Sequence, residues 1–308
     1  MNRRPLGRSE LVIEPLVFGG NVFGWTLPED EAFAVLDAFV DHGFTAIDTS
    51  NSYGKGASET IIGKWLKARN NRAAVHIFTK VGSEMAPGEK GLKHDYIRQA
   101  VEDSLSRLGT DYIDLYQSHK PDPDTAQQET LEAYDMLIRA GKVRAVGCSN
   151  YTPAMIEEAM DLAIKKTLPR YESCQPEYNL YARDSFEGAL QQTCEKHEIG
   201  VIPYFSLASG FLTGKYRSEA DIGDAQRGRL VKQYLNDKGF RILDALDRVA
   251  EETGATPAEI SLAWLVRQPG VTAPIASATS VKQVESLAKG VRLELSAEQL
   301  NTLTEAGR

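Results

Sequence analysis

Residues 44–59 read "FTAIDTSNSYGKGASE" and contain one complete transition from a predicted strand to a predicted helix. The apolar run ends at Asp48, and a polar loop that contains Gly54 and Gly56 follows it. β-Branched and aromatic residues favour a strand, glycines allow the chain to turn, and a serine such as Ser58 often caps a helix. The stretch therefore predicts a buried strand, a loop, and a helix that begins near Ser58.

The same alternation recurs along the chain, because short β-branched or aromatic runs are each followed by a longer segment with apolar residues every three or four positions. Eight strands are predicted in this way, at residues 16–20, 44–49, 75–80, 112–119, 143–149, 173–178, 200–207 and 271–277. Such a series indicates either a closed (β/α)8 TIM barrel or a doubly wound open sheet. The number of strands, and the lack of a compositional shift that would mark a domain boundary, favour the TIM barrel. We therefore expect an α/β fold in which residues 1–308 form a single domain.

Several additions to the barrel are expected. Residues 3–14 predict a small N-terminal β-hairpin, and residues 208–239 form a long polar insert after the seventh strand. Thr256 followed by Pro257 is typical of a helix start, so we expect additional helices between the seventh and eighth strands and at the C-terminus. Pro274 lies within the eighth run and removes one backbone donor from the predicted sheet.

Composition limits the classes of partner. The 308-residue chain has a net charge of −8, which argues against nucleic acid, because a phosphate backbone favours a basic surface. No apolar run approaches the roughly 18 residues of a membrane span, and the N-terminus lacks the apolar core of a signal peptide. Cys148, Cys174 and Cys194 do not have metal-ligand spacing. We expect a cytoplasmic protein without a metal or a membrane partner, and the sequence leaves its oligomeric state open.

Polar residues stand where three of the predicted strands end. In a TIM barrel the carboxyl ends of the strands face the active site. Asp48, Lys80 and His119 end the second, third and fourth strands, and Tyr53 lies just beyond the second. Each of them alone also fits an ordinary turn, packing or solvated role, but their convergence on one end of the barrel indicates a catalytic site. A buried amine such as Lys80 needs a charged partner, and Asp48 can supply it.

These four side chains suit the delivery of a proton. A tyrosine hydroxyl has an unperturbed pKa of about 10, and we expect the Lys80 ammonium to lower the pKa of Tyr53 while Asp48 holds the ammonium in place. The imidazole of His119 would orient a carbonyl oxygen toward the phenol. The sequence contains no GxSxG, no Ser–His motif and no metal-spaced histidines. A group that donates a proton to a carbonyl oxygen needs a partner that attacks the carbonyl carbon, and a hydride is the natural partner.

A cofactor site is expected in the loops after the last strands. Gly54 and Gly56 lack the third glycine of a dinucleotide fingerprint, and "GFLTGKY" (210–216) is too short for a P-loop. The loops after the seventh and eighth strands are the usual phosphate site of a barrel, and Lys215 and Thr279 lie there. The other candidates at strand ends are Ser149, Asn150 and Gln175 for a carboxamide, Tyr204 for a planar ring, and Ser277 and Ser280 for an anion.

With these residues placed, the chain resembles the aldo-keto reductase superfamily, in particular its bacterial branches with an N-terminal hairpin. The resemblance runs from "LVFGGNVFG" (16–24) to "SATSVKQVESL" (277–287). Between them it rests on "FTAIDTSNSYGKGASE" (44–59), "FTKVG" (78–82), "DLYQSHKPD" (114–122), "VGCSNY" (146–151), "QPEYNLYAR" (175–183) and "PYFSLASGFLTGKY" (203–216).

The resemblance implies a (β/α)8 barrel that binds NADP(H) in an extended form, with NAD(H) as the alternative, and reduces a carbonyl. It implies Asp48, Tyr53, Lys80 and His119 as the catalytic tetrad, in which Tyr53 donates the proton, Lys80 and Asp48 tune Tyr53, and His119 orients the substrate. The implied cofactor contacts are Gly20, Asn21, Ser149, Asn150, Gln175, Tyr204, Phe205, Ser206, Leu207, Ser209, Gly210, Lys215, Ser277, Thr279 and Gln283. The implied substrate contacts are Trp25, Tyr53 and His119.

The chain departs from the family pattern at the adenosine end. Many members have Gly-Ala-Arg after the eighth strand and then Gln-x-x-Glu-Asn, whereas residues 277–279 here read Ser-Ala-Thr. Gln283 is present, but Ser286 and Leu287 replace the Glu-Asn pair. Because an arginine ligand for a 2′-phosphate is missing, we expect Thr279 and Lys282 to replace it and NADPH to be preferred.

Two other functions remain open at this point. A non-catalytic NADP(H)-sensing module, like the potassium-channel β subunits that share the fold, would retain the same residues. A Schiff-base aldolase would use Lys80 as its nucleophile. The substrate of a reductase is narrowed only to an aldehyde or ketone, such as a small carbonyl or a sugar-like molecule.

Overall fold

The computed structural model describes residues 2–223 and 228–308. It contains an eight-stranded parallel sheet in the order β10-β3-β4-β5-β6-β7-β8-β9. The strands are β3 (Val17–Gly19), β4 (Ala46–Asp48), β5 (His76–Val81), β6 (Ile113–Ser118), β7 (Val143–Ser149), β8 (Tyr171–Gln175), β9 (Gly200–Val201) and β10 (Ile275–Ala276). All eight predicted strands are confirmed, in sequence order around the sheet.

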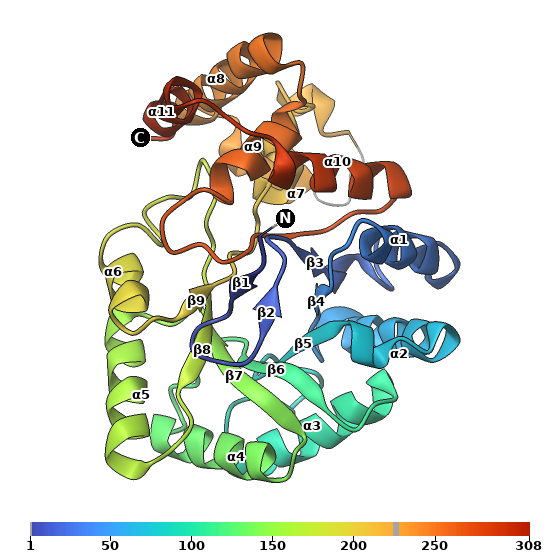
Figure 1. The fold of residues 1–308 in the computed structure, drawn as a ribbon, viewed down its shortest axis with the longest axis vertical. Coiled ribbons are helices and arrows are strands. Elements are labelled where there is room, and N and C mark those ends of the chain that lie inside the picture. Colours follow the sequence, from blue (N-terminus) through green and yellow to red (C-terminus); the bar gives the residue numbers. More distant parts are fainter. Residues whose placement is uncertain (1, 224–227) are drawn as a thin grey trace.

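The two edges of the sheet meet. The amide of Thr272 donates to the carbonyl oxygen of Val201 at 2.8 Å, and the amide of Ile275 donates to that of Pro203 at 2.9 Å. The segment before β10 therefore lies along β9 and its continuation, and the sheet closes into a barrel that Figure 1 shows end on. The doubly wound alternative is excluded by this closure.

The last two strands are shorter than predicted. The seventh run was expected at 200–207 and the eighth at 271–277, but β9 and β10 have two residues each. Pro203 and Pro274 have no amide hydrogen, so regular pairing cannot continue through them. The chain after β9 nevertheless stays extended, since the amide of Tyr204 donates to the carbonyl oxygen of Pro176 at 2.9 Å.

Helices surround the barrel, and neighbouring helices from α1 to α6 pack side by side, with α10 beside α1 (Figure 1). They are α1 (Glu29–Asp41), α2 (Ala57–Arg69), α3 (His94–Leu108), α4 (Gln127–Arg139), α5 (Pro153–Lys166), α6 (Ala189–Lys196), α9 (Pro257–Leu265) and α10 (Val281–Arg292). The helix start predicted at Thr256 is confirmed, because its hydroxyl accepts a hydrogen bond from the amide of Glu259.

The start of α2 differs from the prediction. The helix begins at Ala57, and the preceding Gly56 has a left-handed φ of 91°. Ser58 is fully buried and its hydroxyl donates to the carbonyl oxygen of Gly20 at 2.7 Å, so it is not a cap. The predicted Ser58 cap is therefore wrong, because a contact with a distant loop takes the hydroxyl that a cap would need.

The extra helices lie where they were expected. After β9 come α7 (Gly228–Val231) and α8 (Asp237–Thr253), together with short 3-10 turns at Ala208–Thr213, Glu219–Asp221 and Lys232–Tyr234. The remainder of the predicted insert, residues 224–227, lies outside the described residues. Helix α11 (Ala297–Ala306) ends the chain and packs on α8.

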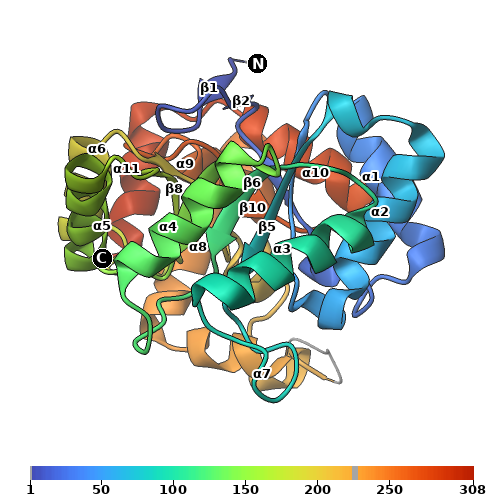
Figure 2. The same ribbon diagram turned by 90° about the horizontal axis from the view of Figure 1, so that it is seen from below.

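An N-terminal hairpin closes one end of the barrel. Strands β1 (Arg4–Pro5) and β2 (Val12–Ile13) pair antiparallel, which confirms the predicted hairpin. Leu6, Leu11 and Ile13 are buried in one apolar cluster with Val17, Ala46, Phe78, Leu115, Ala145, Ile202, Ala273 and Ile275 of the barrel. Figure 2 shows the hairpin at one end of the molecule and α7 at the opposite end. The open end is therefore the one at which the strands finish.

Two further observations concern partners. Within residues 2–223 and 228–308, no helix combines the length and apolar character that crossing a membrane requires. In the same described part of the chain, His, Cys, Asp and Glu side chains do not gather in groups of three that could hold a metal ion.

Candidate active site

The alternation of strand side chains builds a polar layer on the apolar floor of the barrel. Successive residues of a strand point to opposite faces, so residues two apart share a face. Phe78 and Leu115 belong to the apolar floor, and two positions further along the same strands stand Lys80 and Gln117. Asp48 follows Ala46 of the floor in the same way. The three polar side chains are therefore brought together inside the barrel, and all are buried.

Lys80 uses all three of its N–H donors. Its Nζ donates to Asp48 Oδ2 at 2.5 Å and to the carbonyl oxygen of Thr49 at 2.8 Å. The third partner is the hydroxyl of Tyr53, at 3.3 Å. Burial disfavours the charge on Lys80, but Asp48 and then Tyr53 outweigh this effect and raise the pKa of the amine. Lys80 is thus an ammonium at neutral pH.

Tyr53 enters the site from the loop after β4. Burial raises the pKa of its phenol above the ordinary value of 10; Lys80 lowers it by less, and Asp48 adds to the rise. The expected lowering by Lys80 is therefore present, but the expected net direction is wrong, because the loss of solvent outweighs the nearby ammonium. Tyr53 consequently carries its proton at neutral pH.

The loop that carries Tyr53 requires glycines. Gly54, Lys55 and Gly56 all have left-handed backbones, with φ of 57°, 54° and 91°. Glycine adopts this conformation at no steric cost, and the middle residue is held there by its neighbours. The loop turns sharply enough to bring Tyr53 back over the barrel.

His119 follows the end of β6 and faces Tyr53. The two rings meet edge to face with centroids 5.8 Å apart, and Ser50 Oγ lies 3.1 Å from His119 Nδ1. Burial, together with the charges of Lys80 and Lys120, lowers the pKa of His119 to about 3. The imidazole is therefore neutral at physiological pH and can donate one N–H to a carbonyl oxygen.

Two amides hold the other oxygen of Asp48. Nε2 of Gln117 and Nε2 of Gln175 each lie 3.1 Å from Asp48 Oδ1. Gln117 was not among the residues expected from the sequence. Its position two residues before His119, on the same face of the strand, is the signal that would have indicated it.

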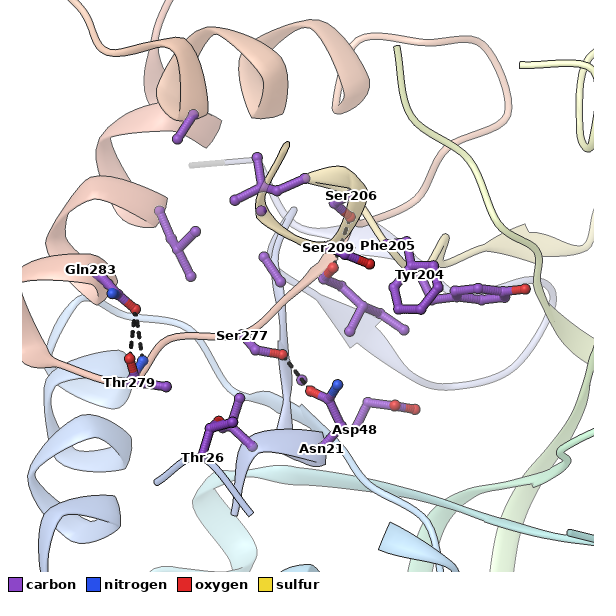
Figure 3. A pocket seen from close by; sticks show the side chains of 18 of the residues that line it. Asn21, Thr26, Asp48, Tyr204, Phe205, Ser206, Ser209, Ser277, Thr279 and Gln283 are labelled. Carbon is purple, nitrogen blue, oxygen red and sulfur yellow. Dashed lines mark hydrogen bonds between the residues drawn. The ribbon is translucent and has the colours of Figure 1, made fainter. Parts of the chain in front are cut away.

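A cavity of about 970 Å³ opens above these residues. Asp48, Tyr53 and His119 line it, whereas Lys80 lies beneath and is fully buried. Figure 3 shows Tyr204 and Phe205 on one side of this pocket and Thr279 and Gln283 on the other. The expected cofactor residues that line it are Asn21, Ser149, Asn150, Gln175, Tyr204, Phe205, Ser206, Leu207, Ser209, Gly210, Lys215, Ser277, Thr279 and Gln283.

Two expected residues are placed differently. Gly20 is buried behind the lining residues Gly19 and Asn21, and its carbonyl oxygen accepts the hydroxyl of Ser58. Trp25 has 48% of its surface exposed and does not belong to the described lining, so its role in substrate binding stays a prediction. The lining residues that the sequence did not indicate include Val22, Thr26, Thr213, Tyr216 and Ala258.

The residues expected at a cofactor carboxamide form a connected hydrogen-bond network. Ser149 Oγ donates to the carbonyl oxygen of Gln175 at 2.8 Å, and Asn150 Nδ2 donates to Ser149 Oγ and to the carbonyl oxygen of His119, both at 3.0 Å. The hydroxyl of Tyr204 donates to Asn150 Oδ1 at 2.8 Å. The ring of Tyr204 is therefore tied to the end of β6, where His119 lies.

The loop after β9 is built from unusual backbone. Phe205, Ala208 and Ser209 have left-handed φ values of 53°, 47° and 58°, which side chains with a Cβ rarely adopt. Strain of this kind clusters at functional sites. The Ser209 hydroxyl is buried without a hydrogen-bond partner among the described residues, and Lys215 lines the same cavity. A hydroxyl donor and an ammonium fit a phosphate-bearing cofactor such as a nicotinamide dinucleotide.

At the far end of the pocket the lining residues Thr279, Gln283 and Ser286 are uncharged. Gln283 Oε1 accepts from the amide of Thr279 at 2.8 Å and from its hydroxyl at 3.2 Å (Figure 3). Ser280 caps helix α10, and Ser286 donates to Glu259. Gln283 therefore braces the turn that precedes the helix.

Comparison with known proteins agrees with this geometry. The model of the aldo/keto reductase family matches residues 15–308. A probable voltage-gated potassium channel subunit beta of Arabidopsis thaliana is 33% identical over 94% of this chain and 91% of its own length. The protein tas of Escherichia coli is 31% identical, with 97% and 96% covered. The NADP(+)-designated aldo-keto reductase yakc of Schizosaccharomyces pombe is 31% identical, with 90% and 83% covered. The chain belongs to the aldo/keto reductase family.

Proposed function

We propose that the protein is an NADP(H)-dependent oxidoreductase that reduces an aldehyde or ketone to the alcohol. The observation that carries the proposal is the contact of the Tyr53 hydroxyl with Lys80, which is itself paired with Asp48. These groups lie in the polar layer at the base of a large cavity. Family membership supports the same reaction class.

The cofactor is expected to lie along the cavity. When bound, a nicotinamide cofactor supplies the hydride for the carbonyl carbon. Ser149, Asn150 and Gln175 would hold the carboxamide, and the ring of Tyr204 would stack on the nicotinamide. The backbone and side chains of residues 206–210, together with Lys215, would hold the pyrophosphate.

Tyr53 acts as the general acid. Because its pKa is raised, the phenol holds a proton at neutral pH and can donate it to the carbonyl oxygen as the hydride arrives. The Lys80 ammonium then stabilises the phenolate that forms, and Asp48 keeps Lys80 in place. His119 is neutral, and in the tautomer whose Nδ1 accepts from Ser50 the other ring nitrogen, Nε2, donates to the same carbonyl oxygen.

The replacement Tyr53→Phe tests the proton donor. We expect kcat for carbonyl reduction to fall at least about 100-fold, which is the usual contribution of a general acid, while NADPH binding measured by fluorescence is nearly unchanged. Tyr116→Phe is the matched control, because it also removes a tyrosine hydroxyl, and that hydroxyl is buried and has no hydrogen-bond partner among the described residues. A Tyr53→Phe protein with wild-type kcat would show that another group donates the proton.

The preference between cofactors is a separate prediction. We expect a higher kcat/KM with NADPH than with NADH, through contacts of Thr279, Lys282 and the start of α10 with a 2′-phosphate. Steady-state kinetics with both cofactors on one substrate measures this ratio. A clear preference for NADH would contradict the expectation and would agree with the neutral groups at that end of the pocket.

One relative supports a second candidate function. Because a similar protein is named as a potassium channel β subunit, a cofactor-binding module with slow turnover is the alternative. A screen of NADPH oxidation over aldehydes, ketones and sugars separates the two functions, since the alternative predicts binding of NADPH without appreciable turnover of any of them. The aldolase alternative is disfavoured, because Lys80 is fully buried, lies beneath the cavity and stays protonated.

A further inference from the structure

We propose that Gln117 is a positioning residue of this site: with Gln175 it holds one carboxylate oxygen of Asp48, so that Lys80 keeps an N–H for Tyr53. The inference rests on the proposed function only in assigning a catalytic role to Tyr53. The arrangement of the side chains that carries it can be tested without any turnover.

Asp48 is held from two sides. Its Oδ2 accepts from Lys80, and its Oδ1 accepts from the carboxamides of Gln117 and Gln175, each at 3.1 Å. Asp48 and Gln175 are 2% exposed and Gln117 is not exposed at all, so little solvent reaches these three side chains. The two amides are neutral, so they hold the Asp48 carboxylate in place without forming a second ion pair that would weaken the one with Lys80.

The second amide depends on the first. Gln117 Oε1 accepts from Gln175 Nε2 at 3.2 Å and from Ser173 Oγ at 3.4 Å. Both ends of the Gln117 carboxamide are therefore engaged, and its orientation is determined. Removing Gln117 removes one donor from Asp48 and also the acceptor that orients Gln175.

The arrangement matters because Lys80 has no spare donor. Its three N–H groups serve Asp48 Oδ2, the Thr49 carbonyl and Tyr53, and the contact with Tyr53 is the longest, at 3.3 Å. A released carboxylate can turn about its Cβ–Cγ bond and present both oxygens to the ammonium. The ammonium hydrogen-bonds an ionised carboxylate oxygen more strongly than a neutral phenol, so the second oxygen of Asp48 would take the N–H that Tyr53 now receives.

The test replaces Gln117 with leucine, which cannot donate. In a crystal structure of Gln117→Leu we expect both Asp48 oxygens near Lys80 and a longer distance from Lys80 to Tyr53. For alcohol oxidation, which needs the phenolate, kcat rises with pH as Tyr53 loses its proton, and we expect the midpoint of this rise to move to higher pH by about half a unit to one unit, equivalent to one lost hydrogen bond. The Kd of NADP+, measured by fluorescence, should change less than about twofold.

Two further variants separate positioning from packing. Gln117→Glu keeps the shape, but its new carboxyl donates to Asp48 only when protonated; its activity relative to the wild type should therefore fall as the pH rises, unlike that of Gln117→Leu. Ser173→Ala is the matched control, because Ser173 contacts Gln117 and not Asp48. It should keep the wild-type pH profile. If Gln117→Leu does not fold, Gln117→Met, which is also unable to donate, takes its place.

The proposal is overturned by an unmoved Asp48 in the crystal structure, or by a Gln117→Leu profile identical to those of the wild type and Ser173→Ala. Failure of the proposed function has a different signature. In that case the wild-type chain reduces no carbonyl in the screen, and the position of Asp48 in the Gln117→Leu crystal structure still decides the inference.

Discussion

At the residue scale, His119 shows how the site sets a protonation state. The lowered pKa, about 3, keeps the ring neutral over the working range of most enzymes. Because the pKa in the unfolded chain is near 6.5, the unfolded state binds this proton first as the pH falls. The contribution of His119 to stability is therefore complete above pH 6.5 and is lost progressively as the pH falls toward 3.

The prediction is that His119→Gln reduces this acid sensitivity. Between pH 6.5 and 5 the wild-type free energy of unfolding should fall by up to about 2 kcal/mol more than that of the variant. This is the change that follows from a His119 pKa of 6.5 in the unfolded chain and about 3 in the folded protein. Urea denaturation at the two pH values measures the difference. An NMR titration of the His119 ring with a midpoint above pH 5 would contradict the assignment.

At the scale of elements, an ion pair between the buried Glu59 and the partly exposed Arg107 joins α2, β5 and α3 near the loop that carries Tyr53. Glu59 is fully buried, accepts from Arg107 Nε at 2.7 Å and accepts from Thr79 Oγ1 at 2.5 Å. Thr79 precedes Lys80, and a side chain at Gly56 would meet Arg107 at 2.7 Å. The pair therefore supports both the lysine strand and the tyrosine loop.

Arg107→Leu should consequently cost much more than an ordinary surface substitution. We expect the free energy of unfolding to fall by about 3–5 kcal/mol, because Glu59 is left buried without its partner. Arg139→Leu is the control, since Arg139 pairs with Asp135 in the same helix and is 74% exposed, and its change should stay below about 1 kcal/mol. Equal effects of the two substitutions in denaturant titrations would show that Glu59 finds another donor.

At the scale of the whole molecule, the two ends of the barrel have separate roles. The hairpin fills the floor with Leu6, Leu11 and Ile13, while Tyr53 and His119 line the cavity at the other end. Figure 2 shows the hairpin and α7 at opposite ends of the molecule. Substitutions in the floor should therefore change stability and leave the chemistry intact.

Leu6→Ala tests this separation. Leu6 is fully buried, so we expect the free energy of unfolding to fall by about 2–5 kcal/mol with kcat unchanged at 25 °C. Val12→Ala in the same hairpin is the control, because Val12 is 38% exposed and its effect should stay within about 0.5 kcal/mol. A loss of kcat in folded Leu6→Ala protein would show that the two ends are coupled.

The sequence by itself determined the eight strands, the hairpin, and the strand ends that carry Asp48, Lys80 and His119. These follow from local patterns, because side-chain alternation and the position at which an apolar run stops are readable over a few residues. The sequence also placed Tyr53 in a glycine loop at the same end of the barrel.

Only the tertiary structure decided the rest. The net rise in the pKa of Tyr53 comes from burial, which no short stretch of sequence reveals. The two amides on Asp48 come from Gln117, 69 residues away, and Gln175, 127 residues away. The Ser58 hydroxyl does not cap α2 as predicted, because it donates to the carbonyl oxygen of Gly20, which is 38 residues away. Desolvation and hydrogen bonding depend on which distant segments lie against one another. The closed barrel determines this, because it places the ends of all its strands around one site.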